Sequence, residues 1–502
     1  MSFRIRFGQA ALTVALLVTA LFSGSLPAAA QDTGTIVPLD HPMAPFLESR
    51  AFAASVGATN EFRKMEWVAF DPVNNKIYWA MSEVSKGMSD GAGAVNVEEN
   101  LCGIVYAGDV DADFNVATIT PLIVGGPYDE ANEENPCDVN NIANPDNLYV
   151  DPAGRLWIGE DTSNHANNVL WMWDGTLHRF ATVPTGAETT GVFVTAEGSL
   201  FFNAQHPSGR NIYPYNRGFL GVVTGFKATD SFSELPAPQG PDRNKVLVAA
   251  GEYQMLGRAG TLLPNTPSGE RFGEVIRPDG SRQAICNQPD ANMFVPTVED
   301  GSAGYLYTNY ECPTAGVSQL YIRNDGAAWE VVEGQMVDAS SVNGVWTLCG
   351  GAVSPWNTAL TAEEYEPIAS LDGWQQNIAD MSDYLGEQAN PYDYGYIVEM
   401  MPDEDGDTIN AVLQKRYAMG RFSHENAIVM PDLKTVYHGD DGTDVVFFKF
   451  VADEAGDLSA GTLYAAKATQ GENSSFGLEW LELGHGNDDE IAEAIATLEL
   501  PE

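Results

Sequence analysis

The chain has 502 residues, of which 70 are Asp or Glu and 25 are Lys or Arg, so its formal net charge is −45. A surface this acidic repels nucleic acid and anionic membranes, and we expect neither as a partner. With 10% aromatic residues, a chain of this length can bury a large core that does not depend on disulfides.

The first 30 residues have the pattern of a secretory signal peptide. Arg4 and Arg6 precede an apolar run at residues 10–22, and residues 26–30 supply the small side chains of a cleavage site. The basic residues do not form a twin-arginine pair, which favours export of the unfolded chain. We therefore expect an exported protein, periplasmic or extracellular, whose mature part is one domain at residues 31–502.

The clearest local pattern is a β-hairpin at residues 144–161, NPDNLYVDPAGRLWIGED. One apolar run enters a turn at residues 151–154 and a second run leaves it, as in a short antiparallel pair. Asp146 opens the first strand and Asp161 follows the second. Because neighbouring antiparallel strands run in opposite directions, both carboxylates should lie at the same edge. In chain order, the same unit recurs at residues 66–83, 144–161, 190–206, 293–311, 351–364 and 425–440.

Six such hairpins in a chain rich in turns are typical of a β-propeller. We predict an all-β, six-bladed β-propeller in which each hairpin supplies inner strands of one blade. Acidic residues at the hairpin ends would then gather at one end of the central axis: Glu66, Glu83, Asp146, Asp161, Glu311, Glu364, Glu425 and Asp440.

This predicted acidic mouth indicates a metal site. Carboxylates a few ångströms apart raise one another's pKa unless cations neutralise them, and calcium prefers hard oxygen ligands. The alternative is that each acid satisfies backbone groups at a strand end. Two further acidic runs, at residues 109–113 and 403–407, lack the spacing of a calcium-binding loop and are interpreted as solvated loops.

Two stretches depart from the β pattern. Residues 361–388 and 490–498 have helical spacing and acidic first turns, which predicts inserted or terminal helices on the rim. Residues 218–281 are rich in Gly, Pro and charge, and are expected to hold outer strands and a long loop. These two insertions, near 218–281 and 361–388, interrupt the single predicted domain.

Five cysteines in an exported chain predict disulfides with one thiol left over. The nearest pairings along the chain are Cys102 with Cys137 and Cys286 with Cys312, which leaves Cys349. The sequence alone leaves the pairing open.

Several motifs together resemble one known family, the PhoX-type alkaline phosphatases. The matching stretches are KMEWVAFDP (64–72), residues 144–161, ETTGVFVTAEGSLFFNAQHPSG (188–209), YLYTNYE (305–311), CGGAVSPWNTALTAEE (349–364), GYIVEM (395–400), GRFSHENAIV (420–429) and FFKFVA (447–452). The resemblance implies an exported six-bladed propeller that hydrolyses phosphate monoesters with calcium and iron. The motif blocks stand in circularly permuted order, which a closed ring of blades tolerates.

The resemblance also implies roles for individual residues. It places Lys64 and Glu363 as catalytic candidates, and Lys64 stands where the family has an arginine, so the charge is kept and the bidentate fork is lost. Ala362 stands where the family has a cysteine that ligates iron, which implies several calcium ions rather than iron. No organic cofactor is expected. The implied metal ligands are Glu66, Asp146, Glu311, Glu363 and Glu425.

His206 and His424 are the histidines nearest these motifs. We interpret His206 as a structural residue at a strand end, with a supporting role behind the metal ligands or an acid–base role as the alternative.

The leading hypothesis is a calcium-dependent phosphatase that acts on small phosphorylated substrates. The alternatives are a catalytically silent calcium-binding propeller that serves as a binding or interaction module, and a lactonase- or esterase-like propeller hydrolase. The sequence gives no indication of the oligomeric state.

Overall fold

The computed structural model describes residues 35–266, 268–370, 373–402 and 411–501. Contacts divide the chain into the units Met1–Thr33 and Gly34–Glu502, and the account below concerns the second unit. The predicted signal peptide at residues 1–30 and the acidic run at residues 403–407 lie outside the described residues.

The described residues form mainly antiparallel strands, and the predicted all-β class is confirmed. The first group of strands is β1 (Phe62–Asp71), β2 (Lys76–Met81), β3 (Ile104–Val110) and β4 (Val116–Val124). The second group is β5 (Pro145–Val150), β6 (Leu156–Glu160), β7 (Val169–Trp173) and β8 (Leu177–Thr182), with β12 (Leu247–Val248) at the edge. The third group is β9 (Glu188–Val194), β10 (Leu200–Gln205), β11 (Phe219–Thr224) and β13 (Glu252–Arg258).

Three further groups follow the same antiparallel pattern. The fourth group is β16 (Pro289–Pro296), β17 (Ala303–Tyr310), β18 (Gly316–Asn324) and β19 (Trp329–Met336). The fifth group is β20 (Leu348–Val353), β21 (Ala359–Glu363), β22 (Ile397–Pro402) and β23 (Ala411–Lys415). The sixth group is β24 (His424–Val429), β25 (Thr435–Val445), β26 (Phe448–Glu454) and β27 (Asp457–Gln470), followed by β28 (Phe476–Asn487). A separate pair consists of β14 (Glu274–Ile276) and β15 (Arg282–Ile285). The six predicted hairpins are confirmed as the first two strands of each group.

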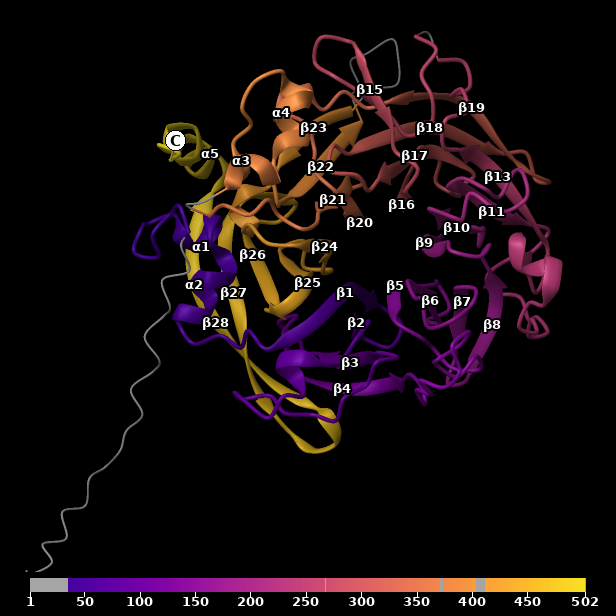
Figure 1. Ribbon diagram of the computed structural model, residues 1–502, viewed down its shortest axis with the longest axis horizontal. Helices are drawn as coiled ribbons and strands as arrows, with labels where there is room; N and C mark the ends of the chain where they lie inside the picture. The colour runs from indigo at the N-terminus through magenta and orange to yellow at the C-terminus, as the bar shows by residue number, and fades with distance from the viewer. Residues whose placement is uncertain (1–34, 267, 371–372, 403–410, 502) are drawn as a thin grey trace, which may run out of the picture. The chain divides into compact units, whose positions relative to one another are not determined.

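The first strands of the six groups contact one another in a closed cycle, β1 to β5, β9, β16, β20, β24 and back to β1. Figure 1 shows these strands facing the centre, with later strands of each group farther out. The first and last groups also share hydrogen bonds, because β1 pairs with β25 and β4 pairs with β28. Segments from both ends of the described chain therefore meet in one nine-stranded sheet.

An aspartate fixes the turn of three of these hairpins. Asp151 Oδ1 accepts hydrogen bonds from the backbone N–H of Ala153 and of Arg155, at 2.9 and 3.1 Å. Asp71 and Asp432 accept two backbone N–H groups each in the equivalent turns of β1–β2 and β24–β25. This local chemistry sets the loop length and hence the register of the strands.

Helices occupy only short stretches of the described chain. They are α1 (Ala44–Leu47), α2 (Ser49–Ser55), α3 (Trp374–Asn377), α4 (Ala379–Leu385) and α5 (Asp488–Thr497). The helix predicted at residues 490–498 is confirmed by α5. Within the helical span predicted at residues 361–388, the described helices are confined to α3 and α4, and residues 361–363 belong to β21, where Thr361 pairs with Val398 of β22.

Apolar side chains fill the spaces between neighbouring sheets and form most of the core. Disulfides join Cys102 to Cys137 and Cys286 to Cys312, and Cys349 is a buried free thiol. Within the described residues, no helix has both the length and the apolar character needed to cross a membrane.

Candidate metal centre

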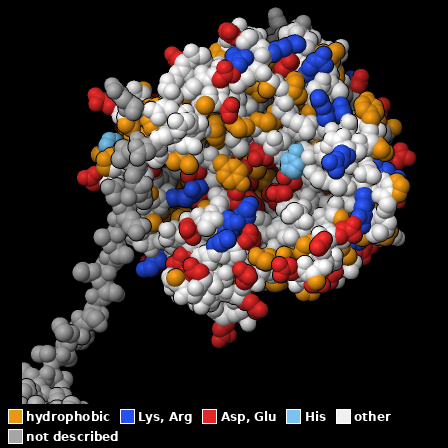
Figure 2. Space-filling view, viewed as in Figure 1, with side chains coloured by type: hydrophobic (Ala, Val, Ile, Leu, Met, Phe, Trp, Pro, Cys, Tyr) orange, Lys and Arg blue, Asp and Glu red, His pale blue; other side chains and the backbone are white. Residues whose placement is uncertain are grey.

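Acidic side chains gather where the innermost strands meet. In Figure 2, acidic groups lie deep in the central hollow of this face, with basic groups and a histidine close to its edge. Among the residues that the structure describes, three groups of possible metal-ligating atoms occur here, and within each group the atoms lie within 4.8 Å of one another.

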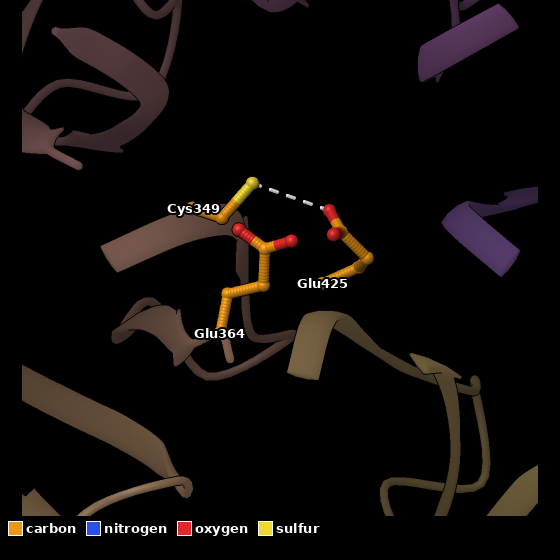
Figure 3. A group of neighbouring side chains, drawn as sticks. All are labelled: Cys349, Glu364 and Glu425. Carbon is orange, nitrogen blue, oxygen red and sulfur yellow. Dashed lines mark hydrogen bonds between the residues drawn. The ribbon is translucent and has the colours of Figure 1, made fainter. Parts of the chain in front are cut away.

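The first group combines a thiol with two carboxylates: Cys349 on β20, Glu364 just after β21 and Glu425 on β24. Their side chains point toward one another, and Cys349 Sγ donates to Glu425 Oε2 at 3.2 Å (Figure 3). All three are buried. Burial and the neighbouring carboxylates raise the pKa of the Cys349 thiol and of both glutamates well above their usual values.

The second group shares Glu425 and adds Glu66 on β1 and Asp146 on β5. Burial is the largest cause of the raised pKa of both added carboxyl groups, followed by Asp441 for Glu66 and by Glu66 for Asp146. Glu425 Oε1 has no hydrogen-bond partner among the described residues although it is buried. A carboxylate oxygen in this position is available to a cation.

The third group is Asp146, Asp161 and Glu188, and it reaches the surface. Asp161 follows β6 and is exposed, whereas Glu188 begins β9. Burial and then Asp161 raise the pKa of Glu188 well above its usual value. His206 Nε2 lies within hydrogen-bond distance of Glu188 Oε1, so this histidine lines the mouth.

Glu311 and Asp290 extend the acidic surface on the side of β16 and β17. Gln205 Nε2 donates to Glu311 Oε2 at 2.5 Å, and burial raises the pKa of Glu311 to about 7. Burial and then Glu311 raise the pKa of Asp290, whose Oδ1 has no hydrogen-bond partner among the described residues.

These residues fit bound metal ions. Several buried carboxylates face one another, burial and then their mutual repulsion raise their pKa values, and Glu425 Oε1 and Asp290 Oδ1 are unpaired among the described residues. The all-oxygen groups have the ligand chemistry that calcium prefers, whereas the thiol of Cys349 beside two carboxylates suits a transition metal such as iron.

The structure places a thiol at the centre that the expectation drawn from Ala362 did not include. Ala362 is buried in an apolar cluster, where it contributes to the packing between sheets. Cys349, which lies 13 positions earlier in the same motif, provides the sulfur at the centre. The absence of a cysteine at position 362 therefore does not leave the site without a thiol.

Glu363 lies outside the three groups. Its Oε1 pairs with Lys415 Nζ at 2.9 Å, and its Oε2 accepts the backbone N–H of Gly395 and Tyr396. Both charged side chains are fully buried, so this is a structural ion pair. Its neighbour Glu364 is the residue that joins Cys349 and Glu425.

Two other acids of the predicted mouth are paired with arginines. Glu83 Oε2 lies 3.2 Å from Arg63, and Asp440 Oδ1 lies 2.8 Å from Arg50. Burial, opposed by Arg50, raises the pKa of Asp440 to about 6. Neither acid belongs to the three groups.

Lys64 lies at the edge of the acidic groups. Its Nζ is 3.2 Å from Glu66 Oε1 and 3.6 Å from Asp441 Oδ1, and these carboxylates raise the pKa of the ammonium group. Tyr365 donates its hydroxyl proton to Asp441 Oδ2 at 2.7 Å from the other side. The structure thus brings Lys64 together with Glu66, Asp146 and Glu425.

The two histidines differ in their surroundings. His424 is fully buried, burial lowers its pKa to about 3, and its Nε2 faces the carbonyl of Gly420 at 2.9 Å. This agrees with a structural role. His206 is part of the mouth through its contact with Glu188.

Sequence reasoning did not name Glu188, Asp290 or Asp441 as site residues and did not assign Cys349 to the centre. A signal for Asp290 was present, since Pro289-Asp290 opens β16 in the way that Pro145-Asp146 opens β5. Glu188 likewise begins the third hairpin. Asp441 directly follows Asp440, and only the fold shows which of the two reaches the centre.

Comparisons with known proteins agree with the motif resemblance. The family model described as alkaline phosphatase PhoX matches residues 30–208 and 265–499, which is most of the chain. A search of curated proteins finds no match.

Similar solved structures include PhoX of Pseudomonas fluorescens in complex with vanadate, at 18% identity and a TM-score of 0.34, over 49% of this chain and 60% of that chain. The match therefore spans less than two thirds of that protein. Virginiamycin B lyase of Staphylococcus aureus matches at 9% identity and a TM-score of 0.36, over 85% and 97% of the two chains. A putative 6-phosphogluconolactonase of Bacteroides uniformis matches at 10% identity and 0.31, over 84% and 87%.

Proposed function

The chain belongs to the alkaline phosphatase PhoX family, and from this premise we propose that it is an exported, metal-dependent hydrolase of small phosphate monoesters. The observation that carries the proposal is the continuous acidic centre in which Glu425 links a thiol-containing group to an all-oxygen group, with Lys64 at its edge.

The proposed metal ligands are Glu66, Asp146, Glu311 and Glu425, with Glu364 in place of Glu363. Cys349 adds a thiolate, so the centre would hold calcium on its oxygen-rich side and iron beside the sulfur. When bound, these cations would supply Lewis acidity and offset the negative charge of the phosphoryl oxygens.

The side chains of this centre have separate roles. The neighbouring Glu66 carboxylate raises the pKa of Lys64 and so favours its charged form, which would bind a phosphoryl oxygen as a point charge. Tyr365 holds Asp441 in place by its 2.7 Å hydrogen bond, and Asp441 in turn faces Lys64. Burial excludes water from the inner carboxylates, which strengthens their interaction with any bound cation.

The proposed fold is a six-bladed β-propeller with one four-stranded group in each blade. The closed cycle of contacts among β1, β5, β9, β16, β20 and β24 supports it, as does the pairing that joins the first and last groups. The two disulfides support export, because disulfides persist in oxidising compartments.

The test is reconstitution of the purified protein after chelation. Calcium and ferric iron are added singly and together, metal content is measured by elemental analysis, and 4-nitrophenyl phosphate hydrolysis is followed by absorbance. We expect turnover only in the reconstituted protein. Glu425→Gln should lose both metal and turnover, whereas Glu330→Gln, at an exposed ion pair with Arg323, should keep both.

Metal binding without turnover of any phosphate ester would contradict the phosphatase and favour the silent calcium-binding alternative. Turnover that survives complete metal removal would contradict the assignment of the acidic centre.

A further inference from the structure

A polar pocket of about 400 Å³ opens directly beside the acidic centre. Lys64 and Asp161 form the side that it shares with the centre, and Tyr128, Ser163 and Asn164 lie among the residues of its other walls. A molecule whose phosphoryl group meets Lys64 would therefore place its remaining part in this pocket. Its volume is within the usual range for small-molecule sites.

The walls offer many hydrogen-bonding groups and little apolar surface. Asp161 presents an exposed carboxylate and Ser163 an exposed hydroxyl. Tyr128 is 42% exposed and provides an aromatic surface at the rim. Leu101 is the only aliphatic side chain among the described lining residues.

The amide of Asn164 is held in place for recognition. Its Nδ2 donates to Asn144 Oδ1 at 2.9 Å, and the same oxygen accepts the hydroxyl of Thr162 at 2.5 Å. Asn164 Nδ2 also donates to Leu101 O at 3.4 Å, and neither bond of this amide uses its Oδ1 acceptor. A rigid polar wall loses little conformational entropy when a ligand binds.

A disulfide anchors the same wall to the sheet. Tyr128 forms a β-bridge with Cys137, the backbone N–H of Cys137 donates to Asn164 O at 3.2 Å, and Cys137 is bonded to Cys102. The Tyr128 segment and the Asn164 loop are therefore fixed relative to each other.

We infer that this pocket is the leaving-group subsite and that it selects phosphate monoesters of polyhydroxylated alcohols, such as sugars and polyols. The inference rests on the proposed function. Hydroxyl groups can donate to Asp161 and Asn164 Oδ1 and can exchange hydrogen bonds with Ser163, while the ring of Tyr128 packs against a carbon face. An apolar leaving group would desolvate these polar groups without replacing their hydrogen bonds.

Hydrolysis of such an ester breaks one P–O bond. The phosphoryl group passes to water, and the alkoxide oxygen of the sugar takes up the proton that water releases. The products are inorganic phosphate and a neutral polyol, which leaves through the open pocket.

The test compares a hexose 6-phosphate with cyclohexylmethyl phosphate, which has a similar size and no hydroxyl groups. We expect kcat/KM to favour the hexose ester by ~10-fold or more, since several hydrogen bonds are lost with the analogue. Ser163→Val should reduce this preference ~3-fold or more by removing one hydrogen-bonding hydroxyl. Ser341→Val, at an exposed serine outside the pocket, is the matched control and should keep the preference.

A thermal melt checks that each variant is folded, and Tyr128→Leu tests the aromatic wall if Ser163→Val does not fold. Equal kcat/KM for the two esters in the wild-type protein overturns the subsite while the phosphatase stands.

If neither ester is hydrolysed by the metal-loaded protein, the proposed function fails, and the subsite is decided by calorimetry with the two non-hydrolysable phosphonate analogues. Tighter binding of the hexose phosphonate, reduced in Ser163→Val, supports the subsite. Equal binding of the two, or binding of neither, overturns it.

Discussion

At the scale of single residues, neighbours in one motif have opposite roles. Glu363 neutralises buried Lys415, whereas Glu364 faces Cys349 and Glu425. Ala362 packs in the core. The partner of each acidic side chain therefore decides its role. An acid paired with a buried cation stabilises the fold, and an acid that faces other acids is available to a metal.

This contrast predicts opposite effects of two glutamine substitutions. Glu363→Gln leaves the Lys415 ammonium buried without its charge partner and should lower the free energy of unfolding by about 3–5 kcal/mol. Glu425→Gln removes one of several repelling carboxyl groups and should leave the metal-free protein at least as stable, while metal content falls. Urea unfolding and elemental analysis measure the two effects. Metal loss in both variants alike would contradict the separation.

The position of the Cys349 thiol can be tested by spectroscopy. Cobalt(II) bound beside this sulfur should show a thiolate charge-transfer band, and Cys349→Ser should abolish it. Adding Ala362→Cys to Cys349→Ser should not restore the band, because residue 362 lies in the apolar core. Restoration of the band in the double variant would show that position 362 reaches the metal.

At the scale of elements, the hairpin is the unit that carries both stability and ligands. In three of the six hairpins an aspartate fixes the turn, and the open ends of the hairpins present acids to the centre. Asp151 illustrates how the turn is fixed. Besides two backbone N–H groups, its Oδ2 accepts Arg155 Nε at 2.8 Å and Trp157 Nε1 at 3.0 Å.

Removal of this turn acceptor should be costly. Asp151→Ala leaves buried donors without partners and should lower the free energy of unfolding by about 2–4 kcal/mol. Asp174→Ala, which removes an exposed turn acceptor for Thr176, is the matched control and should cost less than about 1 kcal/mol. Chemical denaturation compares the two, and similar losses would contradict the role given to Asp151.

At the scale of the whole described unit, closure of the cycle brings acids from different sheets into one buried centre. Their mutual repulsion opposes folding when no cation is present. Glu311 shows the direction in which stability changes with pH. Its pKa of about 7 in the folded protein lies above its usual value of 4.5, so its contribution to stability is fully present below about pH 4.5 and is lost as the pH rises through 7.

The chelated protein should therefore melt at a higher temperature near pH 5 than near pH 8. Added calcium should raise the melting temperature at pH 8 more than at pH 5, because the ligands must be ionised to bind it. Scanning calorimetry at both pH values, with and without calcium, measures this. A metal-free melting temperature that rises from pH 5 to pH 8 would contradict the repulsion.

Local chemistry made much of the fold predictable. The alternating apolar runs of the six hairpins and the aspartate turns of three of them follow from short stretches of sequence, and so does the all-β class. Helix α5 was predictable from its acidic first turn, with Asn487 as its N-cap. The structure at the start of residues 361–388 was not predictable in this way, because the helical spacing there competes with the pairing of Thr361 to Val398, which lies 37 positions away.

The sequence by itself determined which hairpin ends carry acids, because those residues flank the strands directly. Only the tertiary structure decided which acids meet. Successive side chains leave a strand on opposite faces, so the pair Glu363-Glu364 could not be resolved from its motif. Cys349, Asp146 and Glu425 come from β20, β5 and β24, and their approach depends on the cyclic contact of innermost strands far apart in the chain. This long-range packing brings acidic residues that are far apart in the sequence into one centre.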